Sequence, residues 1–367
     1  MNPRTSIALF ALALTGTACL RVSEERARRD LEIGRAQASF GAVAVEDGLA
    51  AIRRFEPGVL ELWANAPVLR VRLTTPPESD ATWSVHVRNV VTDAEVFVGE
   101  AGEEQRPLAA DAPRATERRF DLAVEAGGVT HLEVRPPDAD SREPFDFIAL
   151  ADVQEAIDRV GDVFARMNAE SSARFAMFSG DITSRGSTDE LLRFQNEMRA
   201  LDMPIFTTLG NHELGEEDVP YHSIFGRGSQ SFVYRHVRFT FLDSASATVD
   251  PLVYDWLREW IEAARNGTHL VFMHVPPREP IGLRNGAFSS RAEAAKLLRI
   301  LGAGGVDGTF YGHVHSFYAF ENAGIPAYIS GGGGAIPERF DGIGRHFLLV
   351  RVDPETSETN VRVVRVD

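Results

Sequence analysis

The chain has 367 residues and carries 38 basic and 53 acidic side chains, for a formal net charge of −15. Its length suggests two domains, and 44% hydrophobic residues can supply a packed core, which excludes global disorder. The negative charge disfavours a general nucleic-acid binder, and the single cysteine, Cys19, excludes a disulfide framework and a thiolate zinc site.

The first 19 residues have the layout of an export signal. Arg4 precedes an apolar run from Ile7 to Leu14, and small residues then lead to Cys19. Small residues before a lone cysteine resemble a bacterial lipoprotein signal, although Gly16 occupies the place of the usual leucine. We expect export to the cell envelope and a lipid anchor on Cys19. Ordinary cleavage is the alternative.

Residues 20–39 are rich in Arg and Glu, which favours a solvated tether or a short surface helix. From 40 to 138 the apolar residues alternate with period two, as in Val68–Leu73 and Trp83–Arg88, and Gly and Pro clusters separate the runs. This pattern predicts a small antiparallel β-sandwich. The proline-containing segment 136–144 is expected to link this sandwich to a second domain.

From residue 145 to 367 the periodicity changes. Strand-like apolar runs alternate with amphipathic helical segments over about 153–167, 188–201, 252–265 and 290–301, and strands then dominate to the end. We therefore predict an α/β domain in which mixed β-sheets are sandwiched by helices.

Polar residues that can bind metal follow five of these apolar runs. In an open α/β sheet, ligands bind beyond the carboxyl ends of the strands, so these residues are expected to meet in one crevice. Oxygen and imidazole donors without thiolate suit hard or borderline metals. The residues are Asp152, Asp181, Asn211 with His212, His274, and His313 with His315.

Each residue taken singly has an ordinary structural explanation. Asp152 and Glu155 fit a helix capping box, and Gly180-Asp181 and Gly210-Asn211 are common turn dipeptides. A lone His274 is more often a structural hydrogen-bonding residue than a ligand. The ordered set at successive strand ends is what favours a metal site.

The ordered set resembles the calcineurin-like metallophosphoesterases, including their purple-acid-phosphatase-like branch. The motifs are Asp152-x-Gln154, Gly180-Asp181, Gly210-Asn211-His212-Glu213, His274 and Gly312-His313-Val-His315, within about residues 145–350. The resemblance implies two metal ions, Mn, Fe or Zn. It places Asp152, Gln154, Asp181 and His315 on one ion, and Asp181, Asn211, His274 and His313 on the other. His212 would act on the leaving group or the phosphoryl charge without binding metal.

Two positions depart from the family pattern. Gln154 stands where the usual motif has histidine, and an amide oxygen binds a borderline metal more weakly than imidazole. Ser184 stands where some branches place a carboxylate that orients the catalytic histidine, so the partner of His212 is left open.

The implied activity is hydrolysis of a phosphomonoester or phosphodiester, on a small-molecule, lipid or protein substrate. Arg278, Arg284 and His222 lie in loops after ligand-bearing segments and are candidates for substrate binding. One alternative is a catalytically weak surface binding protein with a structural metal domain, and the glutamine in place of histidine at position 154 favours it. The other is a nuclease of the same fold, which the acidic net charge disfavours.

Overall fold

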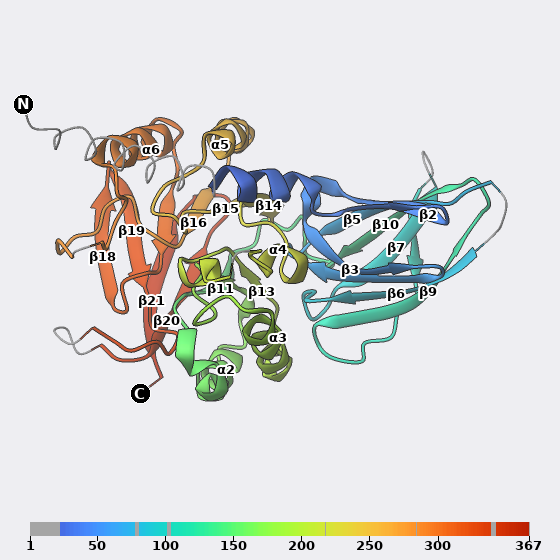
Figure 1. Cartoon of the computed structure of the whole chain (residues 1–367), viewed down its shortest axis with the longest axis horizontal. Coiled ribbons are helices and arrows are strands. Elements are labelled where there is room, and N and C mark those ends of the chain that lie inside the picture. The colour runs from blue at the N-terminus through green and yellow to red at the C-terminus, as the bar shows by residue number, and fades with distance from the viewer. Residues whose placement is uncertain are drawn as a thin grey trace, which may run out of the picture.

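The computed structural model describes residues 23–77, 81–100, 104–216, 218–283, 285–338 and 343–366. A β-sandwich lies at one end of the molecule and an α/β domain at the other (Figure 1). The predicted signal segment and Cys19 fall outside the described residues. Among the described residues, no helix has the length and apolar character that crossing a bilayer requires.

Two sheets form the sandwich. One has the order β1(Arg35–Ala38)-β2(Gly41–Val45)-β5(Leu69–Thr74)-β10(Val129–Arg135)-β7(Glu95–Glu100)-β8(Arg106–Leu108). The other has the order β3(Ala50–Glu56)-β4(Val59–Ala64)-β6(Ala81–Arg88)-β9(Glu117–Val124). The alternating pattern is visible in the burial of β5, where Leu69, Val71 and Leu73 are buried and the residues between them are not. The two-sheet prediction is confirmed, with one difference: β4 and β6 run parallel.

The α/β domain also contains two sheets. The first has the order β13(Ile205–Thr207)-β12(Ala173–Phe178)-β11(Phe145–Leu150)-β20(His346–Val352)-β21(Thr359–Arg365). The second has the order β14(Gln230–Tyr234)-β15(Val237–Leu242)-β16(His269–Met273)-β17(Gly308–Tyr311)-β19(Ile325–Ser330)-β18(Phe317–Asn322). Phenylalanine rings from the two sheets pack against each other: the Phe147 and Phe239 centroids lie 5.3 Å apart. Edge-to-face contacts of this kind add to the energy of burying the rings.

Helices cover the outer face of each sheet and lie on opposite sides of the domain (Figure 1). On the first sheet they are α2(Gly161–Asn168) and α3(Thr188–Glu197), and on the second α5(Pro251–Ala264) and α6(Arg291–Ala303). A four-residue helix, α4(Tyr221–Ile224), lies in the loop before β14. The predicted helix at 153–167 is divided at Val160 into a 3-10 segment, η2(Gln154–Arg159), and α2. The predicted layered α/β architecture is confirmed.

Of the two expectations for residues 20–39, the short helix is observed over residues 23–32 (blue in Figure 1), but it is docked on the α/β domain and is not a solvated tether. Arg26 on this helix is 2% exposed, and its Nε lies 2.6 Å from Oδ2 of Asp243, at the end of β15. Asp30 is 1% exposed and accepts hydrogen bonds from the backbone nitrogens of Gly228 and Ser229. Because these charges have buried partners, a charged sequence is compatible with a docked helix.

Candidate metal centre

The carboxyl ends of parallel strands from both sheets meet at one edge of the α/β domain. In the first sheet β11, β12 and β13 are parallel, and in the second β15, β16, β17 and β19 are parallel. The seven predicted ligands all follow strands of these two sets. The structure therefore brings together side chains spread over positions 152 to 315 of the chain.

Two aspartates form the middle of the cluster. Asp152 is fully buried and Asp181 is 1% exposed, and one ligand atom from each lies within 4.8 Å of the other and of a nitrogen of His274. Oδ2 of Asp152 accepts a hydrogen bond from the backbone nitrogen of His313, so this side chain does not cap η2. Its Oδ1 is buried without a well-formed hydrogen bond, and Nε2 of His315 lies 3.4 Å from it. A buried carboxylate oxygen this weakly paired fits a site that a cation completes.

Each histidine of the cluster uses one ring nitrogen to donate to a backbone carbonyl. The other ring nitrogen is left for the site, which is the usual arrangement of metal-binding histidines in proteins. The hydrogen bonds join His212 Nδ1 to Ser184 O (2.7 Å), His274 Nδ1 to Ser179 O (2.8 Å), His313 Nε2 to Asn285 O (2.8 Å) and His315 Nδ1 to Ile336 O (2.7 Å). The nitrogens that do not bond to a backbone carbonyl are therefore Nε2 of His212, His274 and His315, and Nδ1 of His313.

The two amide side chains contact the same groups. Oδ1 of Asn211 lies 3.0 Å from Nε2 of His274. Nε2 of Gln154 donates to Oδ2 of Asp181 over 2.9 Å and lies 3.1 Å from Nε2 of His315. Binding of a cation by Gln154 requires the amide to rotate so that Oε1 takes the place of Nε2.

The predicted catalytic histidine, His212, lies at the open side of the cluster. Its side chain is 35% exposed, and its Nε2 lies 3.9 Å from Oδ2 of Asp181. The sequence left its orienting partner open, and the structure supplies it: the carbonyl of Ser184. The hydrogen bond to Ser184 holds the ring so that Nε2 faces the site.

Glu213 is a site residue that sequence reasoning did not assign. Its carboxylate is fully buried, and its hydrogen bonds go to groups other than His212. Oε2 accepts from the backbone nitrogens of Asp181 (2.8 Å) and Gly210 (2.7 Å), and Oε1 from the nitrogen (3.0 Å) and hydroxyl (2.8 Å) of Thr183. Burial and the nearby charge of Asp181 raise the pKa of Glu213 to about 7. This carboxylate holds together the two loops that carry Asp181 and Asn211.

Electrostatics in the cluster pair carboxylates with imidazoles. Burial raises the pKa of Asp181, but the charges of His274 and His212 outweigh it and bring that pKa to about 2. Burial lowers the pKa of His274, yet the Asp181 carboxylate raises it to about 9, and Asp152 does the same for His315. A bound cation would take the place of these imidazole protons as the charge that balances the carboxylates.

The backbone around the site is strained. Asp152 (φ 64°), Gln154 (φ 48°), Asp181 (φ 52°) and His313 (φ 71°) all adopt the left-handed conformation, which is uncommon outside glycine. Such strain persists where the surrounding structure over-determines it, and it concentrates at functional sites. Close packing adds a further constraint, because a Cβ at Gly210 would lie 2.1 Å from Oδ1 of Asp181.

The three predicted substrate-binding residues have different outcomes. His222 is 4% exposed with its Nε2 3.3 Å from Asp30 of the N-terminal helix, so it faces that helix and the prediction was wrong. Arg278 is exposed and lines a cavity of about 870 Å³ between the 275–290 loop and α6. Asn285, whose carbonyl accepts from His313, lines the same cavity, which therefore adjoins the cluster. Arg284 lies outside the described residues.

Comparison with known proteins agrees with this fold. Residues 145–317 match the family model described as calcineurin-like phosphoesterase. The purple acid phosphatase PPD1 from yellow lupin (Lupinus luteus) seeds is similar with a TM-score of 0.54 and 12% identity, over 82% of this chain and 70% of that chain. A dimetal phosphatase from Danio rerio has a TM-score of 0.47 and 14% identity, over 61% of this chain and 99% of that chain. No curated protein matches the chain.

The likeness to the lupin structure extends beyond residues 145–367, so it includes part of the β-sandwich. At 12% identity it shows a shared fold. The matched residues 145–317 include the seven candidate metal ligands.

Proposed function

We propose that this protein is a binuclear-metal hydrolase of phosphoesters, whose active site lies in the residues that match the calcineurin-like phosphoesterase model, 145–317. One metal ion would be held by Asp152, Gln154, Asp181 and His315, and the other by Asp181, Asn211, His274 and His313. Asp181, with two carboxylate oxygens, is the residue that would serve both ions.

The arrangement of the imidazoles is the observation that carries the proposal. Three histidines each commit one ring nitrogen to a backbone carbonyl. Nε2 of His274 then lies 3.2 Å from Asp181, Nε2 of His315 lies 3.4 Å from Asp152, and the His313 ring packs edge-on against that of His274. Neutral nitrogen and anionic oxygen donors without sulfur fit Mn, Fe or Zn. Oδ1 of Asp152 fits the same conclusion: it is buried, makes no well-formed hydrogen bond and has only the His315 imidazole, at 3.4 Å, as a charge partner.

Two bound metal ions would supply Lewis-acid activation of the phosphoryl group and of a water nucleophile. The chain itself supplies orientation and proton transfer. Ser184 holds the His212 ring through Nδ1, so that a proton on Nε2 can pass to the oxygen of the leaving group. Glu213 fixes the relative positions of the loops that carry Asp181 and Asn211, because its carboxylate accepts hydrogen bonds from backbone nitrogens of both loops. Misplacement of these groups by an ångström lowers the rate steeply.

The substrate is a phosphomonoester or a phosphodiester of a small molecule, a lipid or a protein. The formal charge of −15 disfavours nucleic acid, because a nuclease that follows a polyanion needs a basic track. The cavity lined by Arg278 and Asn285 adjoins the cluster and is the place proposed for the non-reacting part of the substrate.

Hydrolysis of an aryl phosphate and its diester, by protein stripped of metal and reloaded with manganese, tests the assignment. Asp181→Asn is expected to lose bound metal and turnover together, because it removes the bridging charge. His212→Ala is expected to keep its metal and to lose roughly 10²- to 10⁴-fold in turnover, the usual contribution of a general acid. His131→Ala, in strand β10 of the sandwich, is the control.

If neither Asp181→Asn nor His212→Ala changes the turnover rate, the assignment of the active site is wrong. Wild-type protein that retains metal but hydrolyses neither ester would instead support the surface binding protein, in which the metal domain is structural.

We also propose that the protein is exported and tethered to a membrane by lipid on Cys19, as the small residues before this cysteine suggest. Cys19→Ala is expected to move the protein from the membrane fraction to the soluble fraction without changing turnover. An unmodified mature N-terminus in mass spectrometry would contradict the lipid anchor.

A further inference from the structure

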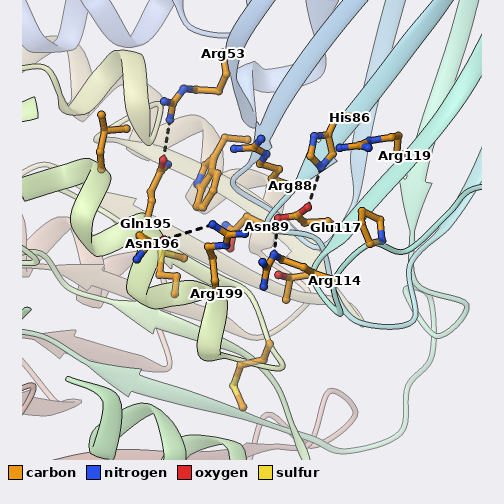
Figure 2. Close-up of a pocket in the computed structure, with 16 residues that line it drawn as sticks. Arg53, His86, Arg88, Asn89, Arg114, Glu117, Arg119, Gln195, Asn196 and Arg199 are labelled. Atoms are coloured by element: carbon orange, nitrogen blue, oxygen red, sulfur yellow. Dashed lines mark hydrogen bonds and ion pairs between the residues drawn. The ribbon is translucent and has the colours of Figure 1, made fainter. Parts of the chain in front are cut away.

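A second cavity, of about 490 Å³, lies where the β-sandwich meets helix α3 (Figure 2). Its lining comes from strands β3, β4, β6 and β9 and their loops on one side, and from α3 and the residues after that helix on the other. Among the residues that line it there is none of the proposed metal ligands. The cavity is therefore separate from the metal centre.

The side chains around this cavity are strongly basic. Five arginines line it, and the single carboxylate among the lining residues is that of Glu117. Glu117 is already engaged: its Oε2 lies 3.0 Å from Nε2 of His86, and its Oε1 lies 3.7 Å from Nε of Arg114. Within the described parts of the chain, the other four arginines pair with no carboxylate. The five are Arg53, Arg88, Arg114, Arg119 and Arg199.

Two of the arginines, at the floor of the cavity, are partly buried, so their guanidinium charges are partly shielded from water. Arg53 is half-buried and donates to the neutral oxygens of Gln195 (3.0 Å) and Ile224 (2.9 Å). Arg88 is also half-buried, and its Nε is buried without a hydrogen-bond partner. Burial and the charge of Arg88 lower the pKa of Arg53, and the charge of Glu61 offsets this only in part. The guanidinium groups are held together here although the protein's net charge is −15, and Glu117 is the one carboxylate among the residues that line the cavity.

Exposed arginines form the rim. Arg114, Arg119 and Arg199 are solvent-exposed and come from both sides of the cavity. Single solvated arginines are common on protein surfaces. Several around one concave, partly desolvated site focus a positive potential that concentrates anions there.

We propose that this cavity binds a small anion with two phosphoryl groups, of the diphosphate class. Five guanidinium groups and one carboxylate give the lining a charge of about +4, and two phosphoryl groups at roughly −1.5 to −2 each balance it. The planar fork of arginine donates pairs of hydrogen bonds that match phosphate oxygens. The volume lies within the range of small-molecule sites, about 300–1,000 Å³.

Binding here would join the two domains. Asn89 lines the cavity from the sandwich side, and its side chain donates to Ile205 O (2.7 Å) and accepts from Ile205 N (3.1 Å). Ile205 begins β13, the strand that leads to Asn211 and His212. An anion held by arginines of both domains is thus expected to raise the unfolding temperature of the whole chain.

Calorimetric titration of the metal-free, full-length protein with pyrophosphate tests the proposal. Removing metal prevents pyrophosphate from binding to metal ions at the metal centre, and the Arg199→Gln variant below distinguishes binding in this cavity from binding elsewhere. Trp63 lines the cavity at 6% exposure, so its fluorescence is expected to change on binding and the change is expected to vanish in Trp63→Phe.

Arg88→Gln and Arg199→Gln are each expected to weaken pyrophosphate binding about ten-fold or more, since each removes charge-assisted hydrogen bonds. Arg199 is exposed, so its variant tests the site even where Arg88→Gln disturbs the sandwich. The matched control is Arg258→Gln, an exposed arginine on α5 that pairs with Asp255.

The proposal is overturned by no binding at millimolar pyrophosphate, by equal affinities of Arg199→Gln and Arg258→Gln, or by citrate binding as tightly as pyrophosphate. Because the titration uses metal-free protein and no turnover, it can fail or succeed independently of the proposed hydrolase.

Discussion

Glu213→Gln is the substitution for which the structure allows the most detailed prediction. The carboxylate accepts four hydrogen bonds in a fully buried position, three of them from backbone nitrogens of Asp181, Thr183 and Gly210. Glutamine keeps one acceptor oxygen, which can serve Asp181 and Gly210. The amide NH₂ then faces the nitrogen of Thr183, which loses its acceptor.

The expected cost can be worked out from these bonds. One buried N–H left without an acceptor costs about 1–3 kcal/mol. Above the Glu213 pKa of about 7, where the carboxylate is charged, replacing it by a neutral acceptor also weakens each of the two remaining bonds by about 1 kcal/mol. The total is roughly 3–5 kcal/mol, which is a large part of a typical stability of about 5–15 kcal/mol. Because Asp181 moves with its loop, metal affinity is expected to fall as well.

Urea unfolding of the metal-free protein measures the loss, provided that the slope of the transition is unchanged. Glu216→Gln is the control, since it removes the same charge from an exposed side chain of the same loop. If Glu213→Gln unfolds at the same urea concentration as Glu216→Gln, the carboxylate does not hold the loops together and the reasoning fails.

Three further substitutions test other parts of the structure. Gly210→Ala is expected to displace Asp181, because its Cβ would lie 2.1 Å from Oδ1 of that residue, and retained metal content would contradict this. Arg26→Met leaves Asp243 buried without its partner and is expected to cost about 3–5 kcal/mol, whereas Arg28→Met on the exposed side of the same helix is expected to change thermal stability little. Burial and the charge of Arg238 lower the pKa of His269 in the folded state to about 3. In the unfolded state this histidine has its ordinary pKa of about 6.5, so between pH 6.5 and 3 the unfolded state binds a proton that the folded state does not. Its contribution to stability is present above pH 6.5 and is lost as the pH falls towards 3, by up to about 1.4 kcal/mol per pH unit, and His269→Gln is expected to flatten the acid limb of the stability profile.

The strand-end residues could be located from the sequence because the information is local. Apolar runs mark the strands, and Gly-Asp and Gly-Asn-His mark the turns after them. Once parallel strands are assumed, their carboxyl ends must share an edge, and Asp152, Asp181 and His274 then lie together. The same local signals predicted the alternating strands of the sandwich and the helices that cover the α/β sheets.

The charged segment after residue 20 shows where local information is insufficient. Its composition is typical of a solvated surface, yet Arg26 is buried against Asp243, which is 217 positions away in the sequence. No periodicity within the segment indicates that partner. His222 was placed near the substrate for the same reason: its neighbour Asp30 lies far away in the chain.

By itself, the amino-acid sequence determined the strands, the helices and the polar residues at the strand ends, since these depend on side-chain periodicity and turn chemistry within a few residues. Only the tertiary structure decided which carbonyl orients each histidine, what Glu213 holds, and that arginines from positions 53 to 199 surround one cavity. Those features depend on the burial and pairing of groups that are distant in the chain, and the energies of such pairs exist only once the domains have packed.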